Sequence, residues 1–188
     1  MRHGLRPRRH LGGLLILACL FLAGCSSTPE LAEPEGEQPS LVFGHIDMSD
    51  APTDLGWVSM KRMRPLTETP YYGFWVVDGT FFVSNTPPGT YKFVKFGGHS
   101  GWKNMNATYS FPDQGKGELD REIHKQGLYY VGSWKYKKIK TGIFQADKFD
   151  LVRVSAPTER ELLERILPYA KHDLWKKAIE RRTRELKK

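Results

Sequence analysis

The chain has 188 residues, a length that one domain accounts for, and a formal net charge of +8. Four arginines before residue 10 belong to a segment with the features of an export signal, so the charge of the remaining chain is about +4. This modest excess does not favour a nucleic-acid-binding protein.

The first 24 residues predict a secretory signal peptide. A basic start is followed by an apolar run from residue 11 to residue 22, and small residues precede Cys25. The run is well short of the roughly 20 apolar residues that span a bilayer, so a transmembrane helix is the weaker interpretation. The segment Leu22-Ala23-Gly24-Cys25 resembles the lipobox of bacterial lipoproteins.

This resemblance implies that residues 1–24 are removed and that Cys25 carries a diacylglyceryl group and an amide-linked acyl chain such as palmitate. Two or more acyl chains hold a protein stably at a membrane. Ser26 implies the outer membrane, with the protein on its periplasmic or surface face. Cys19 leaves with the leader and Cys25 is occupied by lipid, so disulfides and cysteine-based metal or nucleophile chemistry are excluded.

Residues 25–40 predict a lipidated cysteine followed by a flexible tether. The stretch contains three prolines and four glutamates and has no apolar period, so it cannot bury enough surface to offset its ordering entropy. At roughly 5–6 Å × √n, 15 residues span about 20 Å on average. Such a tether would hold the domain just above the lipid headgroups.

Residues 41–155 predict a β-sandwich, because short strands alternate with regular turn signals. Asp78-Gly79 is typical of a type I′ hairpin turn, since both residues tolerate positive φ. Pro87-Pro88-Gly89 predicts a second tight turn, with Gly89 in a conformation that other residues avoid. A loop is expected over the glycine-rich residues 97–106, and a helical turn or an edge strand over 118–126. Strands are expected directly after Gly79 and over residues 41–47, 55–64, 71–77, 90–96, 107–111, 127–140, 143–144 and 149–154.

Turn and core residues of this region resemble a known β-sandwich family. The pattern is Val42-Phe43-Gly44, a variable middle, and then Asp78-Gly79-Thr80-Phe81-Phe82-Val83 followed by Pro87-Pro88-Gly89-Thr90-Tyr91. Over residues 41–96 the chain resembles the carboxypeptidase-regulatory-like, or transthyretin-like, domain. The resemblance implies a mainly β fold, an antiparallel Ig/transthyretin-like β-sandwich, in a non-catalytic accessory, adhesion or structural module. The remainder of the chain is similar to bacterial envelope lipoproteins, and no functional residue carries over.

Residues 156–188 predict a C-terminal appendage of two helices. Thr158 begins a capping box with Glu161, and apolar residues then recur at helical spacing. Pro168 predicts a break, because proline inside a helix costs about 3 kcal/mol. Asp173 is expected to cap the second helix. The residues expected to point inward are Leu174, Trp175, Ala178 and Ile179, and those expected to point outward are Lys176, Lys177, Arg181, Arg182 and Arg184.

The sequence assigns no catalytic residue, metal or cofactor. His45, His99, His124 and His172 remain after processing, and no two have the spacing of metal ligands on one helix. His45 and Asp47 share a strand face, where a plain strand-end pair is the favoured interpretation. Residues 113–120 lack the oxygen ligands that a calcium loop needs at its third and fifth places. The sequence contains no nucleophile elbow and no phosphate-cradling glycine loop, while a Ser–His–Asp site assembled by the fold stays open.

One polar loop holds the candidate ligand-binding residues, which are Trp102, Lys103, Asn104 and Asn106. An aromatic face beside amide and basic side chains suits a sugar ring or a partner surface, although an aromatic lid on the sandwich is the favoured alternative. Basic side chains at 135, 137, 138 and 140 and on the last helix suit anionic headgroups or lipopolysaccharide phosphates. A solvated face is the simpler interpretation of these residues.

The sequence therefore predicts a non-enzymatic, lipid-anchored cell-envelope module with a structural or interaction role. Its expected partners are the membrane, through the lipid on Cys25, and an envelope protein or glycan, but no nucleic acid. The alternative is a factor that binds envelope glycan or lipopolysaccharide through the Trp102 loop and the basic surface. A hydrolase is the third interpretation.

Overall fold

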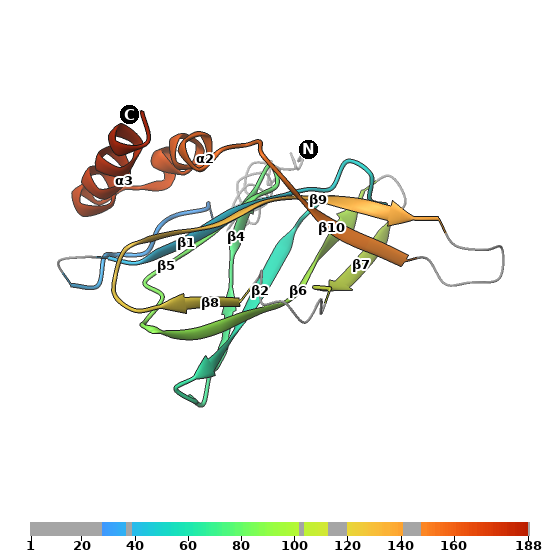
Figure 1. Cartoon of the computed structure of the whole chain (residues 1–188), viewed down its shortest axis with the longest axis horizontal. Helices are drawn as coiled ribbons and strands as arrows, with labels where there is room; N and C mark the ends of the chain where they lie inside the picture. Colours follow the sequence, from blue (N-terminus) through green and yellow to red (C-terminus); the bar gives the residue numbers. More distant parts are fainter. Residues whose placement is uncertain (1–27, 37–38, 102–103, 113–119, 141–147, 188) are drawn as a thin grey trace, which may run out of the picture.

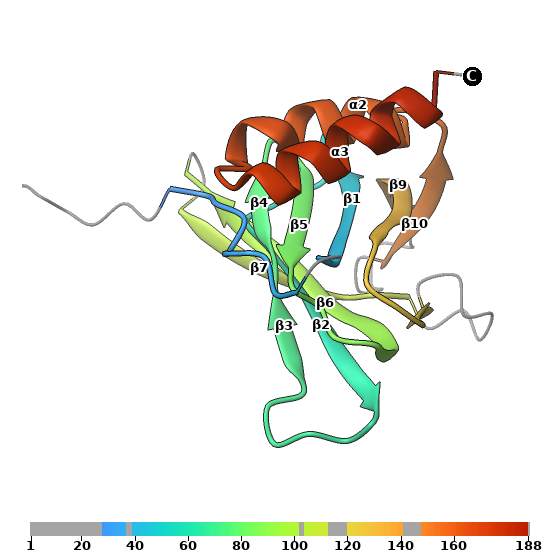
Figure 2. The ribbon, with the colours of Figure 1, turned by 90° about the vertical axis from the view of Figure 1, so that its left-hand side faces the viewer.

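The computed structural model describes residues 28–36, 39–101, 104–112, 120–140 and 148–187. These residues form two packed β-sheets with two helices at the C-terminus, which confirms the predicted β-sandwich with a two-helix appendage (Figure 1). The helices lie across the outer face of one sheet, and a hairpin of the other sheet projects from the opposite end of the molecule (Figure 2).

The first sheet carries the helices and has the strand order β10-β9-β1-β5-β4. Its strands are β1 (Leu41–Asp47), β4 (Trp75–Val77), β5 (Thr80–Ser84), β9 (Leu128–Ile139) and β10 (Lys148–Val154). The pair β1–β9 is parallel, whereas the sequence predicted antiparallel pairing. A parallel pair needs a long crossover, and here the whole second sheet lies between the two strands in the chain.

The second sheet has the order β3-β2-β6-β7, and β8 pairs with the remaining free length of β6. Its strands are β2 (Trp57–Arg64), β3 (Tyr71–Gly73), β6 (Gly89–Ser100), β7 (Met105–Ser110) and β8 (Asp120–Ile123). The polar stretch 118–126 thus contributes an edge strand, one of its two predicted forms. Strand β10 pairs with β9 along its whole length, and residues 143–144, expected to be a strand, lie outside the described residues.

The apolar run 71–77 is two strands and not the one that the sequence predicted. Strand β3 lies in the second sheet and β4 in the first, so the chain passes from one sheet to the other at Phe74. The Phe74 amide donates to the Val58 carbonyl over 3.1 Å, and its ring centroid is 5.4 Å from that of Phe81. Both sheets contribute to the core at this point, so the residues are apolar throughout. An unbroken apolar run is therefore compatible with two strands in different sheets as well as with a single strand.

The turn at Asp78-Gly79 is confirmed. Both residues have positive φ, 47° and 74°, and they join β4 to β5 with Val77 opposite Thr80. The period of two then sends alternate side chains of β5 to different sides of the first sheet. Phe81 packs between the sheets, while Phe82 packs under the helices.

The glycines at 89, 97 and 98 have roles other than those predicted. Gly89 begins β6 and does not have positive φ. The segment before it connects β5 of the first sheet to β6 of the second sheet. In this connection Asn85 has positive φ, at 54°. Gly97 and Gly98 lie within β6 and not in a loop. Each glycine allows a close backbone approach: a Cβ would lie 2.5 Å from the Arg64 carbonyl oxygen at 89 and 1.9 Å from the Asp54 carbonyl oxygen at 98.

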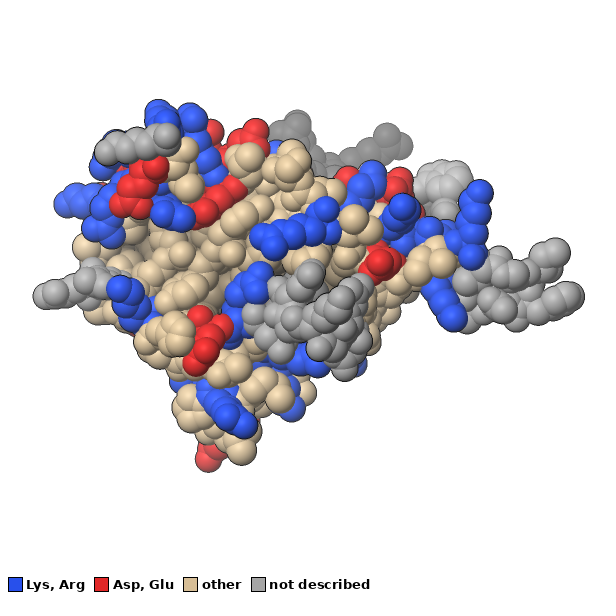
Figure 3. Space-filling model, in the orientation of Figure 1, with Lys and Arg blue, Asp and Glu red and all other residues tan. Residues whose placement is uncertain are grey.

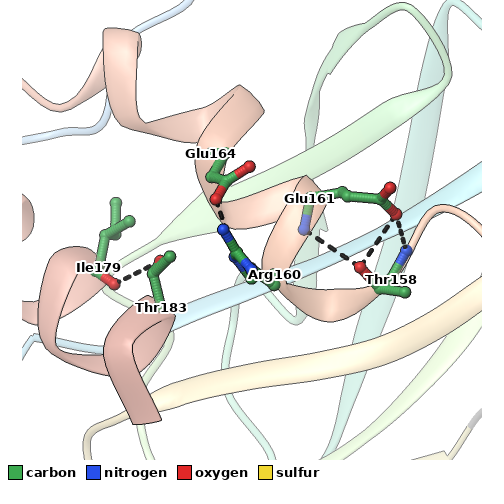
Figure 4. Close-up of polar contacts among 6 residues, drawn as sticks. All are labelled: Thr158, Arg160, Glu161, Glu164, Ile179 and Thr183. Atoms are coloured by element: carbon green, nitrogen blue, oxygen red, sulfur yellow. Dashed lines mark hydrogen bonds and ion pairs between the residues drawn. The ribbon is translucent and has the colours of Figure 1, made fainter. Parts of the chain in front are cut away.

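The C-terminal helices are α2 (Glu159–Ile166) and α3 (Asp173–Glu185), joined through a 3-10 turn, η2 (Leu167–Tyr169). The predicted capping box is present: the Thr158 amide donates to Glu161 Oε2 over 2.6 Å, and the Glu161 amide donates to Thr158 Oγ1 over 3.3 Å (Figure 4). The predicted break at Pro168 is confirmed by η2. The predicted cap at Asp173 is wrong, because His172 occupies the N-cap position.

Most of the predicted inner face of α3 is confirmed, with one correction. Trp175 and Ile179 are fully buried, but Leu174 is 45% exposed. Leu174 precedes Trp175 by one residue, and a step of one residue turns a side chain about 100° around a helix. The face that Trp175 presents to the sheet therefore cannot include Leu174.

Residues 28–36 pack against the folded domain, with residues 30–32 at the helices and residues 33–35 at Asn85 and Gln126, so the predicted flexible tether is wrong for this part of the chain. Leu31 is 1% exposed within the helix-side cluster, and its amide donates to the Tyr169 carbonyl over 3.1 Å. The Trp175 indole donates to the Ala32 carbonyl over 2.8 Å. The segment is ordered because Leu31 is buried and its backbone amide bonds to the connection between the helices. The overall composition of the segment is polar and does not predict these two contacts.

Candidate functional site

A cleft among the described residues lies at the open end of β1, beside the β4–β5 turn. It has a volume of about 500 Å³, and its polar lining includes His45, Asp47, Asp54 and Asp78. His45 and Asp47 reach it from the end of β1, and Asp78 reaches it from the tight turn. The sequence placed His45 and Asp47 together, but it could not show that two distant carboxylates join them.

His45 lies in a polar row across the helix side of the first sheet. It is opposite Thr80 in the antiparallel pair β1–β5 and aligned with Ser133 in the parallel pair β1–β9. His45 Nδ1 and Thr80 Oγ1 are buried without a hydrogen-bond partner among the described residues. Ser133 is fully buried and donates its hydroxyl to the Pro157 carbonyl, so it does not present a nucleophile to solvent.

The surroundings of His45 favour the neutral form of its imidazole. Burial lowers its pKa from the ordinary value of 6.5, and the positive charge of Arg165 lowers it further, while Asp47 opposes both. Asp47 is itself engaged: its carboxylate accepts from the Ser49 amide over 2.8 Å and lies 3.4 Å from Lys135 Nζ. The favoured interpretation of the His45–Asp47 pair, a structural strand end, agrees with these contacts.

Acidification is therefore expected to destabilise the protein through His45. In the unfolded chain His45 takes up a proton as the pH falls through about 6.5, whereas the folded chain resists protonation, so this contribution is complete above that pH and is lost below it. The melting temperature should fall between pH 7.5 and pH 5.5, and less steeply in His45→Gln. Asp47 has a lowered pKa and loses its contribution only around or below 3.8, outside this window. Equal pH slopes in the two proteins would contradict the prediction.

The predicted ligand-binding loop is only partly described. Trp102 and Lys103 lie outside the described residues. Asn104 is exposed with a φ of 44°, and Asn106 is exposed on β7, where its Oδ1 lies 3.0 Å from His99 Nδ1. His99 and Asn106 are thus opposite each other in the antiparallel pair β6–β7. The sequence predicted a single loop over these residues and not this strand pair.

The other histidines form no buried constellation within the described ranges. His124 Nδ1 lies 3.8 Å from Glu122, and both side chains are well exposed. His172 is the N-cap residue of α3. The described residues contain no group of three or more His, Cys, Asp or Glu side chains placed to hold a metal ion. Cys25 also lies outside the described residues.

Sequence reasoning missed the loop between β2 and β3, which projects from the sandwich (Figures 1 and 2). Every residue from 63 to 69 is exposed, and Leu66 is 85% exposed. Met63 and Tyr71, at 41% and 62% exposure, add apolar surface on either side of Leu66. The sequence signal for this exposed site was a leucine inside a turn that two prolines bound, because such turns usually contain polar residues.

The base of this hairpin is firmly held. The Arg62 amide donates to the Pro70 carbonyl over 2.6 Å, and the Arg62 guanidinium donates to the Pro88 carbonyl. Lys61 Nζ lies 5.6 Å from the centre of the Tyr71 ring, a cation–π distance. We call residues 61–71 the projecting hairpin. It combines exposed apolar side chains with basic residues on a hydrogen-bonded base, an arrangement that suits contact with another macromolecule.

Comparison with known proteins gives no match to a family model, to a curated protein or to a solved structure. Of the helices in the described part of the chain, none has both the length and the apolar character that a membrane crossing requires.

Proposed function

We propose that the protein is a non-enzymatic, lipid-anchored module of the cell envelope that contacts a partner protein through the projecting hairpin. The observation that carries this proposal is the exposure of Leu66 in the loop of the projecting hairpin. A monomeric domain gains nothing in stability from a leucine that is 85% exposed, whereas buried apolar anchors dominate binding between proteins. The anchor rests on the lipobox-like segment ending at Cys25, and a location at the outer membrane rests on Ser26.

The aromatic composition agrees with a scaffold role. Rings of Phe74, Phe81, Phe93 and Phe96 fill the space between the sheets, which accounts for many aromatics without any ligand. The His45 cleft has an imidazole and carboxylates, but the aligned Ser133 hydroxyl is buried and bonded. These features support an interaction module over a hydrolase.

Crosslinking in intact cells tests the partner. A photoreactive amino acid at position 66 is expected to capture one protein reproducibly, because this side chain lies where an apolar anchor would enter the partner. The matched control is position 174, which is also an exposed leucine but lies on α3 at the other end of the molecule. Capture of the same protein from both positions, or none from position 66, would contradict the proposed contact.

Labelling with palmitate tests the anchor independently. Cys25→Ala is expected to prevent lipidation of the protein and to leave the leader uncleaved by the lipoprotein peptidase. The change should appear as a larger protein that no longer incorporates labelled palmitate. Unchanged palmitate incorporation in Cys25→Ala would exclude Cys25 as the site of lipidation.

A further inference from the structure

The outward face of α3 carries a cationic stripe. Lys177, Arg181 and Arg184 follow one another at spacings of four and three residues, so they lie on one side of the helix. This side is opposite Trp175 and Ile179, which face the sheet. Figure 3 shows basic atoms gathered over α3, with acidic atoms among them.

No ion pair or hydrogen bond joins these three side chains to another described residue, in contrast to their neighbours. Arg182 on the same helix pairs with Glu159 over 2.8 Å. Arg160 on α2 pairs with Glu164 over 2.9 Å (Figure 4). Arg160 and Arg182 thus each have a carboxylate partner, whereas the three side chains of the stripe have none among the described residues.

The N-terminal segment leaves the fold beside this helix. Leu31 bonds to Tyr169 in η2, and Glu30 Oε2 lies 2.5 Å from Lys171 Nζ, just before α3 begins. Thr28 is three residues from Cys25, so the chain between them spans at most about 11 Å. A lipid on Cys25 would therefore enter the membrane close to the helices and not at the end of a long tether.

We propose that α3 lies against anionic phospholipid headgroups, with Lys177, Arg181 and Arg184 toward the lipid phosphates, and that the packed segment 28–36 holds the domain in this orientation. The inference rests on the lipid anchor of the proposed function. Basic side chains within about a Debye length, roughly 8–10 Å, of an anionic surface are attracted to it. The short connection to Cys25 keeps the stripe within reach of that surface.

The contact is electrostatic and peripheral. Trp175 cannot anchor the helix in lipid, because it is fully buried and its indole donates to Ala32. Leu174 is the one large apolar side chain of α3 that is markedly exposed among the described residues. In this orientation the projecting hairpin, at the opposite end of the molecule, points away from the bilayer and toward a partner (Figures 1 and 2).

The test uses lipidated protein, purified from membranes and reconstituted into phosphatidylcholine vesicles with or without phosphatidylglycerol. Leu174→Cys and Leu66→Cys each introduce a single thiol, since Cys25 is occupied by lipid and Cys19 is removed with the leader. Each thiol carries a fluorophore, and the vesicles carry a headgroup-bound quencher. With phosphatidylglycerol present, the label at 174 is expected to be quenched several-fold more than the label at 66.

Two triple variants identify the surface responsible. In the Leu174→Cys protein, K177Q/R181Q/R184Q should reduce quenching to the level seen without phosphatidylglycerol, because glutamine preserves helix propensity and removes only the charge. K95Q/K140Q/K148Q removes the same charge from exposed lysines within β6, directly after β9 and at the start of β10, and should leave quenching unchanged. High salt should reduce quenching at 174 without changing any side chain, a second measurement that does not depend on how a variant folds.

The outcomes separate the two proposals. Vesicle-bound protein with equal quenching at 174 and 66, or equal loss in both triple variants, would overturn the orientation while the anchor stands. Purified mature protein that carries no lipid and does not float with either vesicle type would overturn the anchor, and the orientation with it. Quenching at 174 that needs phosphatidylglycerol and the three α3 cations would establish the inference.

Discussion

Trp175→Ala is expected to lower the free energy of unfolding by about 3–5 kcal/mol, the usual cost of removing a fully buried aromatic side chain. The indole is 0% exposed in the cluster that joins α3, the first sheet and residue Leu31. Its N–H donates to the Ala32 carbonyl over 2.8 Å, and alanine would leave that carbonyl without the donor. The loss should therefore loosen the N-terminal segment together with α3.

Urea unfolding followed by far-ultraviolet circular dichroism measures this effect without relying on the tryptophan signal. The matched control is Leu174→Ala, one residue earlier on the same helix and 45% exposed, where a change within about 0.5 kcal/mol is expected. Near-equal effects of the two substitutions would show that α3 is not packed on the sheet in solution. In that case the Trp175 side chain would be free to contact a membrane.

Gly98→Ala is expected to destabilise the protein by about 1–3 kcal/mol or more, since an added methyl group has no space. Its Cβ would lie 1.9 Å from the Asp54 carbonyl oxygen and 2.8 Å from the Gly56 amide nitrogen. Both are backbone atoms, so a side-chain rotation cannot relieve the contact. The chain before β2 would have to move away from β6, at the expense of the 2.8 Å bond from the Gly56 amide to the Gly97 carbonyl.

Gly101→Ala is the control for this prediction. It lies in the same glycine-rich stretch, but a Cβ there would meet nothing within 4 Å. The melting temperature of Gly101→Ala should stay close to that of the original protein, while that of Gly98→Ala should fall. Equal melting temperatures would mean that the segment 97–106 is a loop after all, as its composition predicts.

Local signals predicted the elements whose structure depends on neighbouring residues. The alternation of residues 41–47 is strand β1, Asp78-Gly79 is a two-residue turn with positive φ, and Thr158 forms its capping box with Glu161. Each of these features depends on φ preference, a period of two or a contact three residues away. The sequence contains that information within a few positions.

The candidate site was predicted less well. Trp102 and Lys103 remain predictions, because they lie outside the described residues, while Asn104 and Asn106 are confirmed only as exposed. The cleft at His45 and the projecting hairpin were not anticipated. Asp78 lines the same cleft as His45 because β1 pairs with β5, and no local pattern shows which strands pair. Exposure of Leu66 likewise depends on how far its hairpin extends beyond the packed sheets.

By itself, the sequence determined the mainly β class, the positions of most strands and the two-helix appendage, because periodicity and turn chemistry act over short distances. Only the tertiary structure decided that β1 pairs in parallel with β9, that residues 71–77 divide between two sheets and that residues 28–36 pack against the folded domain. These outcomes depend on which apolar surfaces meet. Leu31 shows the reason: one leucine in a polar segment predicts nothing until a pocket formed by distant residues receives it.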